Sequence, residues 1–294
     1  MNRICDSGSS APNQNQESGI KSPETMVTFP PCKINLGLSI LSKRPDGYHN
    51  IETCFYPVPW TDIFEVIQSD RFIFTVSGPP VSGSEGDNLC VRAYSLLKKD
   101  FGIPPVQMHL HKIIPSGAGL GGGSSDAAAT LNTLNEIFSL GISVDGLRLY
   151  ASQLGSDCAF FIEPRPMLGS GRGEILTMLP LKLSGKILVL VNPDIHVSTA
   201  EAYSAAAPWK PVRSITKTLG EPVTEWREKL VNDFEASVFM RHPSLLLVKQ
   251  RFYELGALFA SMSGSGSSVF GLFDKEIDTA KAFSGMRVWS GVLP

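Results

Sequence analysis

The sequence predicts an α+β fold made of two domains. Its 294 residues approach the size at which a chain divides into more than one hydrophobic core. Hydrophobic residues make up 43% of the chain and charged residues 18%, which is typical of a folded globular protein. Segments with the period of strands and segments with the period of helices intermix in both halves of the chain.

The first half contains several strand-like segments followed by amphipathic helices. The segments expected to be strands cover 27–40 (broken near Pro30 and Pro31), 51–58, 63–67, 71–76 and 106–110. Apolar and polar residues alternate in the last two of these segments. Apolar residues recur at helical spacing in the segments expected to be helices, which cover 88–99, a stretch from about 124, and 144–154.

A domain boundary is expected near residue 182. The fully apolar strand 186–191 (KILVLV) follows a stretch containing Pro and Gly, and it opens a second domain over 183–294. The first domain then covers 26–182. The remaining segments with helix or strand patterns in the second half are helices over 199–206, 224–230 and 243–255 and a strand over 269–273.

Residues 1–25 differ from the rest of the chain and are expected to form a disordered leader. They are polar, rich in Ser, Asn, Gln and Pro, and lack the apolar centre of a secretory signal. Their acidic residues also argue against an organelle transit peptide. No uninterrupted apolar run of about 18 residues occurs in the chain, so no transmembrane helix is expected.

Cysteine content and charge exclude several classes of protein. The five cysteines are scattered and form no C-x-x-C pair, which favours reduced thiols in the cytoplasm over a disulfide framework or a zinc site. The formal net charge is −2, which gives no sign of a nucleic-acid or membrane partner. His109 and His111 share the polar face of one strand, but without a third ligand a solvated face is expected there.

A glycine-rich loop between a strand and a helix is the strongest functional signal. Five glycines fall within residues 117–123, and two serines follow at the start of the helix. Glycine lets amide groups turn toward a ligand, and the helix start adds unpaired donors and the positive end of the helix dipole. The loop therefore predicts a polyphosphate site. The P-loop pattern fails because no Lys opens the helix, and the dinucleotide fingerprint lacks its strand context.

Two charged residues lie in apolar surroundings. Asp157 follows a helix within the segment 154–161 (LGSDCAFF), and Lys33 lies in a largely apolar strand. From the residues alone, Asp157 is either a structural hydrogen-bond acceptor or a catalytic base. Lys33 is either a lysine that reaches the surface or a functional group.

Three motifs, in order along the chain, resemble those of the GHMP kinases. They are 31–37 (PCKINLG), 115–125 (PSGAGLGGGSS) and 262–270 (MSGSGSSVF). The resemblance implies an N-terminal ATP-binding domain like the second domain of ribosomal protein S5 and a C-terminal ferredoxin-like α/β sandwich. The substrate and ATP would meet between the two domains.

Two further segments, 44–49 (RPDGYH) and 154–161, resemble one branch of that family, the kinases of 4-(cytidine diphospho)-2-C-methyl-D-erythritol. The resemblance implies ATP-dependent phosphorylation of the 2-hydroxyl of this small molecule in the non-mevalonate isoprenoid route. ATP and Mg²⁺ are the implied cofactors. No acidic partner for Ser124 or Ser125 is evident, so no protein metal ligand is predicted and Mg²⁺ is expected on phosphate and water.

The resemblance also implies a role for individual residues. Asp157 is the expected base, with Lys33 as its charged partner. The expected ATP-binding residues are Pro115, Ser116, Gly117, Ala118, Gly119, Leu120, Gly121, Gly122, Gly123, Ser124 and Ser125, with Asn88 and Lys112 near the adenine. The expected substrate-binding residues are Asn35, Tyr48, His49, Thr199, Tyr203, Gly264 and Gly266. Among them, Tyr48 and Tyr203 would stack on the cytosine and His49 would hydrogen-bond it.

Three other functions remain open at this point. Another GHMP kinase could act on homoserine, mevalonate or a sugar, but the Tyr48–His49 pair argues against it. A non-catalytic sensor of the same fold would be expected to lack Lys33 or Asp157. An RNA-binding module is disfavoured by the absence of basic clusters. The protein is expected to be a monomer or a weak homodimer.

Overall fold

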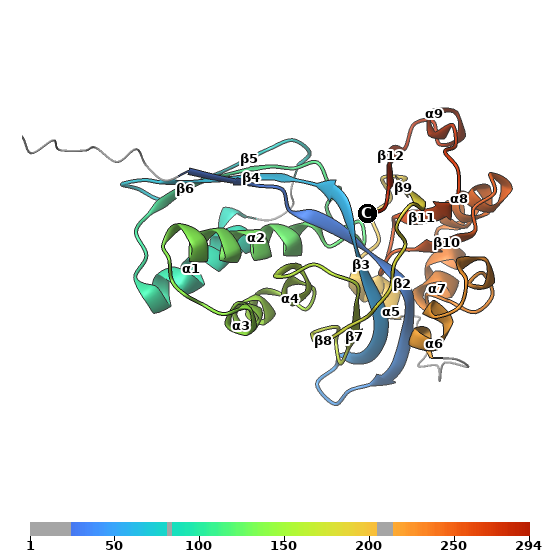
Figure 1. Ribbon diagram of the computed structural model, residues 1–294, viewed down its shortest axis with the longest axis horizontal. Helices are drawn as coiled ribbons and strands as arrows, with labels where there is room; N and C mark the ends of the chain where they lie inside the picture. Colours follow the sequence, from blue (N-terminus) through green and yellow to red (C-terminus); the bar gives the residue numbers. More distant parts are fainter. Residues whose placement is uncertain (1–24, 81–83, 205–213) are drawn as a thin grey trace, which may run out of the picture.

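The computed structural model describes residues 25–80, 84–204 and 214–294, and within these ranges the chain forms three four-stranded sheets (Figure 1). The sheets follow one another along the long axis of the molecule, and the middle sheet lies between two outer sheets that carry most of the helices. Four clusters of buried apolar side chains hold these layers together in the described ranges.

The first sheet belongs to the N-terminal half. Its strands, in spatial order, are β1 (Thr25–Thr28), β4 (Ile63–Gln68), β6 (Val106–His111) and β5 (Ile73–Ser77). Strand β5 runs parallel to β6 and the other pairs are antiparallel. Val106, Met108 and Leu110 alternate with polar residues and are buried in the first core.

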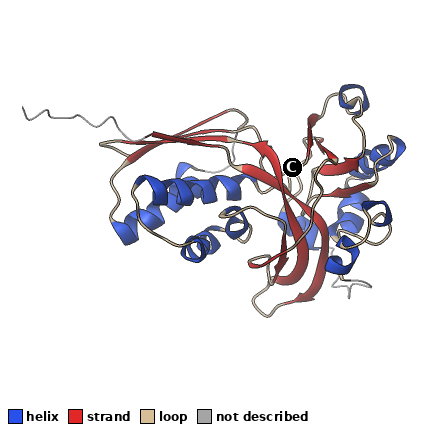
Figure 2. Ribbon diagram, in the orientation of Figure 1, coloured by secondary structure: helices blue, strands red, loops and turns tan. Residues whose placement is uncertain are grey.

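Helices cover one face of this sheet, as Figure 2 shows. In chain order the helices of this half are η1 (Glu85–Asp87), α1 (Leu89–Phe101), α2 (Gly122–Ile137), α3 (Val144–Leu154) and α4 (Cys158–Phe161). Helix α1 is capped at its start by Asn88, whose Oδ1 accepts a hydrogen bond from the Cys90 amide at 2.9 Å, and at its end by Gly102 in the left-handed region. Leu131 and Leu134 of α2 are fully buried in the same core.

The middle sheet links the two halves of the chain. Its strands are β2 (Pro31–Lys43), β3 (His49–Thr61), β7 (Met167–Ser170) and β8 (Ile175–Met178), all antiparallel. Strand β2 also bonds to the C-terminal half, since the Leu38 amide donates to the Val231 carbonyl at 2.9 Å and the Leu38 carbonyl accepts from Asp233 at 2.9 Å. This strand of the N-terminal half is therefore bonded directly to the C-terminal half.

The third sheet is antiparallel, in the order β10 (Phe259–Met262), β11 (Val269–Phe273), β9 (Ile187–Asn192) and β12 (Arg287–Val292). All six residues of β9 are buried, as its apolar sequence predicts. The helices of this half are α5 (Thr199–Ser204), α6 (Ile215–Leu219), η2 (Val223–Glu225), α7 (Phe234–Arg241), α8 (Pro243–Glu254) and α9 (Thr279–Ala282).

One predicted helix is wrong. The segment 224–230 was expected to be helical, but the structure holds only the short 3₁₀ turn η2 there. Trp226 is almost fully buried and its Nε1 donates to the Glu221 carbonyl at 3.0 Å. This anchor, which follows Pro222, fixes a compact loop in place of a regular helix. The remaining expected helices and strands match observed elements, apart from shifts at their ends. The last two residues of the expected helix 199–206 lie outside the described residues.

The predicted leader lies outside the described residues, except for Thr25, which opens β1. Cys5 lies outside them as well. The other four cysteines, Cys32, Cys54, Cys90 and Cys158, are buried and form no disulfide with one another. The domain boundary near 182 stays a prediction. Within the described ranges, none of the helices combines the length and the apolar character needed to cross a bilayer.

Candidate active site

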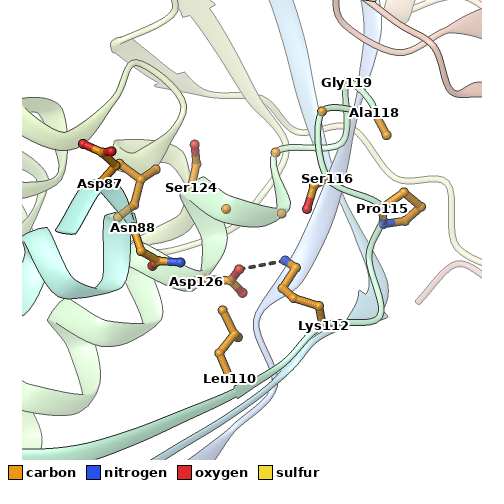
Figure 3. Close-up of a pocket in the computed structure, with 15 residues that line it drawn as sticks. Asp87, Asn88, Leu110, Lys112, Pro115, Ser116, Ala118, Gly119, Ser124 and Asp126 are labelled. Atoms are coloured by element: carbon orange, nitrogen blue, oxygen red, sulfur yellow. Dashed lines mark hydrogen bonds and ion pairs between the residues drawn. The ribbon is translucent and has the colours of Figure 1, made fainter. Parts of the chain in front are cut away.

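Two adjoining cavities lie beside the glycine-rich loop. The smaller cavity, of about 330 Å³, lies between the loop and the start of α1 (Figure 3). The larger cavity, of about 780 Å³, runs toward the hairpin between β2 and β3 and the start of α5. Four residues line both cavities, namely Gly117, Gly119, Gly121 and Ser124. The loop therefore forms the wall that the two cavities share.

The loop has a backbone shape that only glycine adopts readily. Gly119 has a φ of 76° and Gly121 a φ of 71°, both in the left-handed region. A Cβ atom at Gly119 would lie 2.1 Å from the Ser263 carbonyl oxygen, and one at Gly121 would lie 2.9 Å from the Phe161 ring. The dense glycine pattern thus allows the backbone to pass close to its neighbours.

Carbonyl groups of the loop are bonded to the protein, whereas its amides at 119–124 have no hydrogen-bond partner in the described part of the chain. The Gly119 carbonyl accepts hydrogen bonds from Lys33 Nζ and Ser263 Oγ, both at 2.9 Å, and the Leu120 carbonyl accepts one from the Lys33 amide at 3.0 Å. The amides of residues 119–124 donate no hydrogen bond to any described residue. Because helix α2 also starts here, the loop offers a set of donors suited to an anion.

A buried charge network lies beneath the loop. Lys112 forms ion pairs with Asp62 and, at 2.8 Å, with Asp126, and all three side chains are at most 3% exposed. Oδ1 of Asp62 also accepts hydrogen bonds from the amides of Ile113 and Ile114, at 2.5 and 2.8 Å. Figure 3 shows the Lys112 ammonium directed at Asp126. Lys112 therefore lines the smaller cavity with its charge already paired, and its contact with adenine stays a prediction.

Replacing Asp126 by Asn is expected to change how stability depends on pH. Burial raises the pKa of Asp126 to about 7, although Lys112 opposes this shift. Between roughly pH 4 and pH 7 the folded protein then holds a proton that the unfolded chain has released, so stability from this group is present at low pH and lost as the pH rises. Between about pH 5 and about pH 8, the free energy of unfolding of the wild type should fall by at least about 1.4 kcal/mol more than that of the Asp126→Asn protein. Urea unfolding at the two pH values measures this difference.

The matched control for this measurement is Glu136→Gln, on an exposed position of the same helix, which should leave the pH dependence unchanged. An unchanged pH slope in the Asp126→Asn protein would instead mean that Lys112 keeps Asp126 ionised over the whole range.

Lys33 and Asp157 meet in the larger cavity. The distance from Lys33 Nζ to Asp157 Oδ2 is 3.5 Å, and the side chains are 4% and 33% exposed. Lys33 also donates to Asn35 Oδ1 at 2.6 Å, and Asn35 in turn donates to Thr53 Oγ1 at 2.9 Å. The interpretation of Lys33 as a surface lysine is therefore wrong, because its ammonium is buried and fixed. The Asp157 carboxylate remains open to the cavity.

The aromatic residues predicted to hold a base line the same cavity, near the start of β3. Tyr203 stacks on His49, with ring centroids 4.7 Å apart and planes inclined by 15°. The Arg172 guanidinium lies 4.9 Å from the centroid of the Tyr48 ring. The predicted pairing of Tyr48 with Tyr203 around a base stays a prediction, since each ring has another neighbour here. Burial, with a further contribution from Asp157, raises the pKa of Tyr203.

The other predicted residues divide into two groups. Asn88, Pro115, Ser116, Ala118, Gly122 and Gly123 line the smaller cavity, and Asn35, Thr199 and Gly264 line the larger one. Leu120, Ser125 and Gly266 line neither cavity. Leu120 packs into a hydrophobic core, and Ser125 is buried with no partner for its hydroxyl among the described residues. The tip of the predicted loop thus faces the cavities, while part of it is structural.

Some residues of the site escaped the sequence reasoning. The local sequence did not mark four residues as functional, namely Asp62, Asp126, Arg172 and His196. Two clues were present, because Arg172 stands between two glycines and Asp126 directly follows the two serines. Asn232 also went unnoticed, and its amide donates to the carbonyls of Met262 and Gly264 at 2.8 Å each. In the described part of the chain, no group of three or more His, Cys, Asp or Glu residues could hold a metal ion.

The fold and site together define a class of protein. The family model for the GHMP kinases N terminal domain matches residues 88–163, and the model for the GHMP kinases C terminal domain matches residues 216–287. The chain belongs to the GHMP kinase family. The predicted fold class, an S5-like first domain followed by a ferredoxin-like α/β sandwich, is confirmed as the two-domain fold of the GHMP kinases. A mevalonate kinase structure shares the fold alone, with a TM-score of 0.68, 13% identity, and coverage of 90% of this chain and 98% of that one.

More similar proteins point to one branch of the family. The chain is 50% identical over 270 residues to a 4-diphosphocytidyl-2-C-methyl-D-erythritol kinase of Parabacteroides distasonis, covering 91% of this chain and 100% of the relative. It is 52% identical over 255 residues to the enzyme of the same name from Bacteroides thetaiotaomicron, covering 85% and 93%. A crystal structure of 4-(cytidine 5'-diphospho)-2C-methyl-D-erythritol kinase superposes with a TM-score of 0.78 and 33% identity, covering 90% and 98%.

Proposed function

We propose that the protein transfers a phosphoryl group from ATP to the 2-hydroxyl of 4-(cytidine 5'-diphospho)-2-C-methyl-D-erythritol, in the non-mevalonate isoprenoid route. The observation that carries this proposal is the fixed Lys33–Asp157 pair, which lies next to a loop whose amides bond to none of the described residues. The names of relatives at about half identity supply the substrate. Phosphoryl transfer depends mainly on positioning and charge neutralisation, and this arrangement offers both.

In this proposal Asp157 is the base. Its carboxylate is open to the larger cavity, so it accepts the proton of the substrate hydroxyl as the oxygen bonds to phosphorus. Lys33 is held by Asn35 and the Gly119 carbonyl, so its ammonium stays fixed beside Asp157 and stabilises negative charge that develops there. Because Lys33 already contacts Asn35, the Gly119 carbonyl and Asp157, little reorganisation is needed for the proton transfer.

The loop fits the polyphosphate of a nucleotide. The amides of residues 119–124 have no partner among the described residues, and a side chain at Gly119 would fill the space in which the loop packs. When bound, ATP supplies the phosphoryl group and Mg²⁺ neutralises part of its charge. Ser124 is the side chain of the loop that lines both cavities, so we propose it as the one that reaches this charge.

The aromatic end of the larger cavity suits a pyrimidine. His49 lies at the start of β3, whereas Pro57, which pairs with Lys33, lies toward its other end. The cavity therefore extends along the strand and suits an elongated substrate. One end of the cavity offers ring faces and a hydrogen-bonding ring nitrogen, from Tyr48, His49 and Tyr203, and Asp157 lies toward the other end.

Release of ADP with a set of acceptors tests the function. With Mg²⁺ and ATP, the protein should turn over cytidine diphospho-methylerythritol at least about 10²-fold more efficiently than homoserine or mevalonate, because buried polar groups reject ligands that leave them unpaired. Comparable turnover of homoserine or mevalonate would place the protein in another branch of the family. No turnover of any acceptor would contradict the assignment as a kinase.

A further inference from the structure

Permanent positive charge is scarce in the larger cavity. Among the described residues that line it, Lys33 and Arg172 are the two that are Lys or Arg. Lys33 is already held by Asn35, the Gly119 carbonyl and Asp157. Arg172 is therefore the lining cation that is left to pair with an anionic group of a ligand, where that group lies away from Asp157.

Arg172 is held in place by its backbone, while the end of its side chain is left unbonded. It lies in the turn between β7 and β8, and its amide donates to Glu174 Oε2 at 2.5 Å. The flanking Gly171 and Gly173 have φ angles of 69° and 108°, which fix a tight turn. Its Nε lies 3.5 Å from Glu174 Oε1, and its two terminal nitrogens make no hydrogen bond to any described residue.

The neighbours of Arg172 orient its guanidinium. Its central carbon lies 4.9 Å from the centroid of the Tyr48 ring, so the two groups are in cation–π contact. The pKa of Asp46, in the hairpin turn, is lowered chiefly by a hydrogen bond from Arg44, and the charge of Arg172 adds to this effect. Glu174 balances part of the charge, but none of the described carboxylates bonds the terminal nitrogens of Arg172. Two parallel N–H groups in that position match the oxygens of a phosphate.

We infer that Arg172 binds the diphosphate of the substrate and selects nucleoside diphosphates over uncharged nucleosides. The inference rests on the function proposed above. A ligand with its base beside Tyr48 and His49 and its hydroxyl beside Asp157 carries its diphosphate between these ends, next to the side chain stacked on Tyr48. Arg172 is thus a specificity residue that contacts substrate but takes no part in proton transfer.

Competitive inhibition by CDP and by cytidine, each measured against the full substrate, tests this role. Arg172→Gln should raise the inhibition constant of CDP about tenfold or more and leave that of cytidine unchanged, because charged hydrogen bonds are lost only for CDP. Arg172→Lys, which keeps the charge but not the paired donors, should fall between the two. Arg165→Gln is the matched control, since Arg165 is 53% exposed, pairs with Glu163 and lines neither cavity.

The outcomes separate this inference from the proposed function. An equal loss for CDP and cytidine would mean that Arg172 only supports the Tyr48 ring, and unchanged CDP inhibition would also overturn the inference. Wild-type protein that neither turns over the substrate nor responds to cytidine compounds would overturn the proposed function as well. Thermal unfolding of each variant checks that it is folded. If the Arg172→Gln protein does not fold, the inhibition constants are compared between the wild type and the Arg172→Lys protein.

Discussion

Replacing Asp157 by Asn is expected to lower kcat by about 10²- to 10⁴-fold, the usual contribution of a general base. The amide keeps the shape of the carboxylate but cannot accept the proton of the substrate hydroxyl. Lys33 keeps its bonds to Asn35 and to the Gly119 carbonyl, so the surrounding geometry is preserved. The measurement is steady-state ADP release at saturating substrate, and KM should change by less than about threefold.

Asp145→Asn is the matched control for this experiment, because the Asp145 side chain is 90% exposed and lines neither cavity. It should leave kcat unchanged. Substantial turnover by the Asp157→Asn protein would remove Asp157 from the role of base and leave positioning by the loop and Lys33 as the source of catalysis.

Gly119→Ala is expected to have the second large effect. The left-handed backbone alone disfavours Ala by about 1–2 kcal/mol, and the new methyl group would lie 2.1 Å from the Ser263 carbonyl oxygen. The loop must move, and a shift of about 1 Å in positioning groups lowers activity by about 10²-fold. We expect kcat/KM to fall at least that far, and ATP to lose its stabilising effect in thermal unfolding.

Gly102→Ala separates the strain of a left-handed backbone from the steric clash of the added methyl group. Gly102 also has a left-handed φ, of 63°, but nothing lies within 4 Å of its added Cβ, and it caps α1 outside both cavities. This variant should lose about 1 kcal/mol of stability and keep its kinetic constants. Full activity and normal ATP binding in the Gly119→Ala protein would contradict the tight packing of the loop.

The glycine-rich loop and the helix behind it could be predicted from sequence because their signals are local. Glycines, a helix start and hydroxyl residues follow one another along the chain, and helix α2 behind them has a regular apolar stripe. The apolar sequence of β9 likewise led directly to a buried strand. In both cases neighbouring residues in the sequence contain the whole signal.

Contacts between distant segments could not be predicted in this way. Lys112 is buried because Asp62, fifty positions earlier in the chain, pairs with it. Nothing in the sequence around either residue indicates that partner. Arg172 enters the larger cavity only because the β7–β8 turn lies against the β2–β3 hairpin, as the contact with Tyr48 shows. The incorrect helix at 224–230 has the same origin, since burial of Trp226 in tertiary structure overrides local preference.

Strand β2 also bears on how the molecule can move. The same strand that carries Lys33 and Asn35 is bonded at Leu38 to Val231 and Asp233. A hinge that swung the halves apart would have to break these bonds, so rigid-body opening is disfavoured at this point. Amide hydrogen exchange should accordingly be slow along the centre of β2 and fast in the hairpin that bears Tyr48.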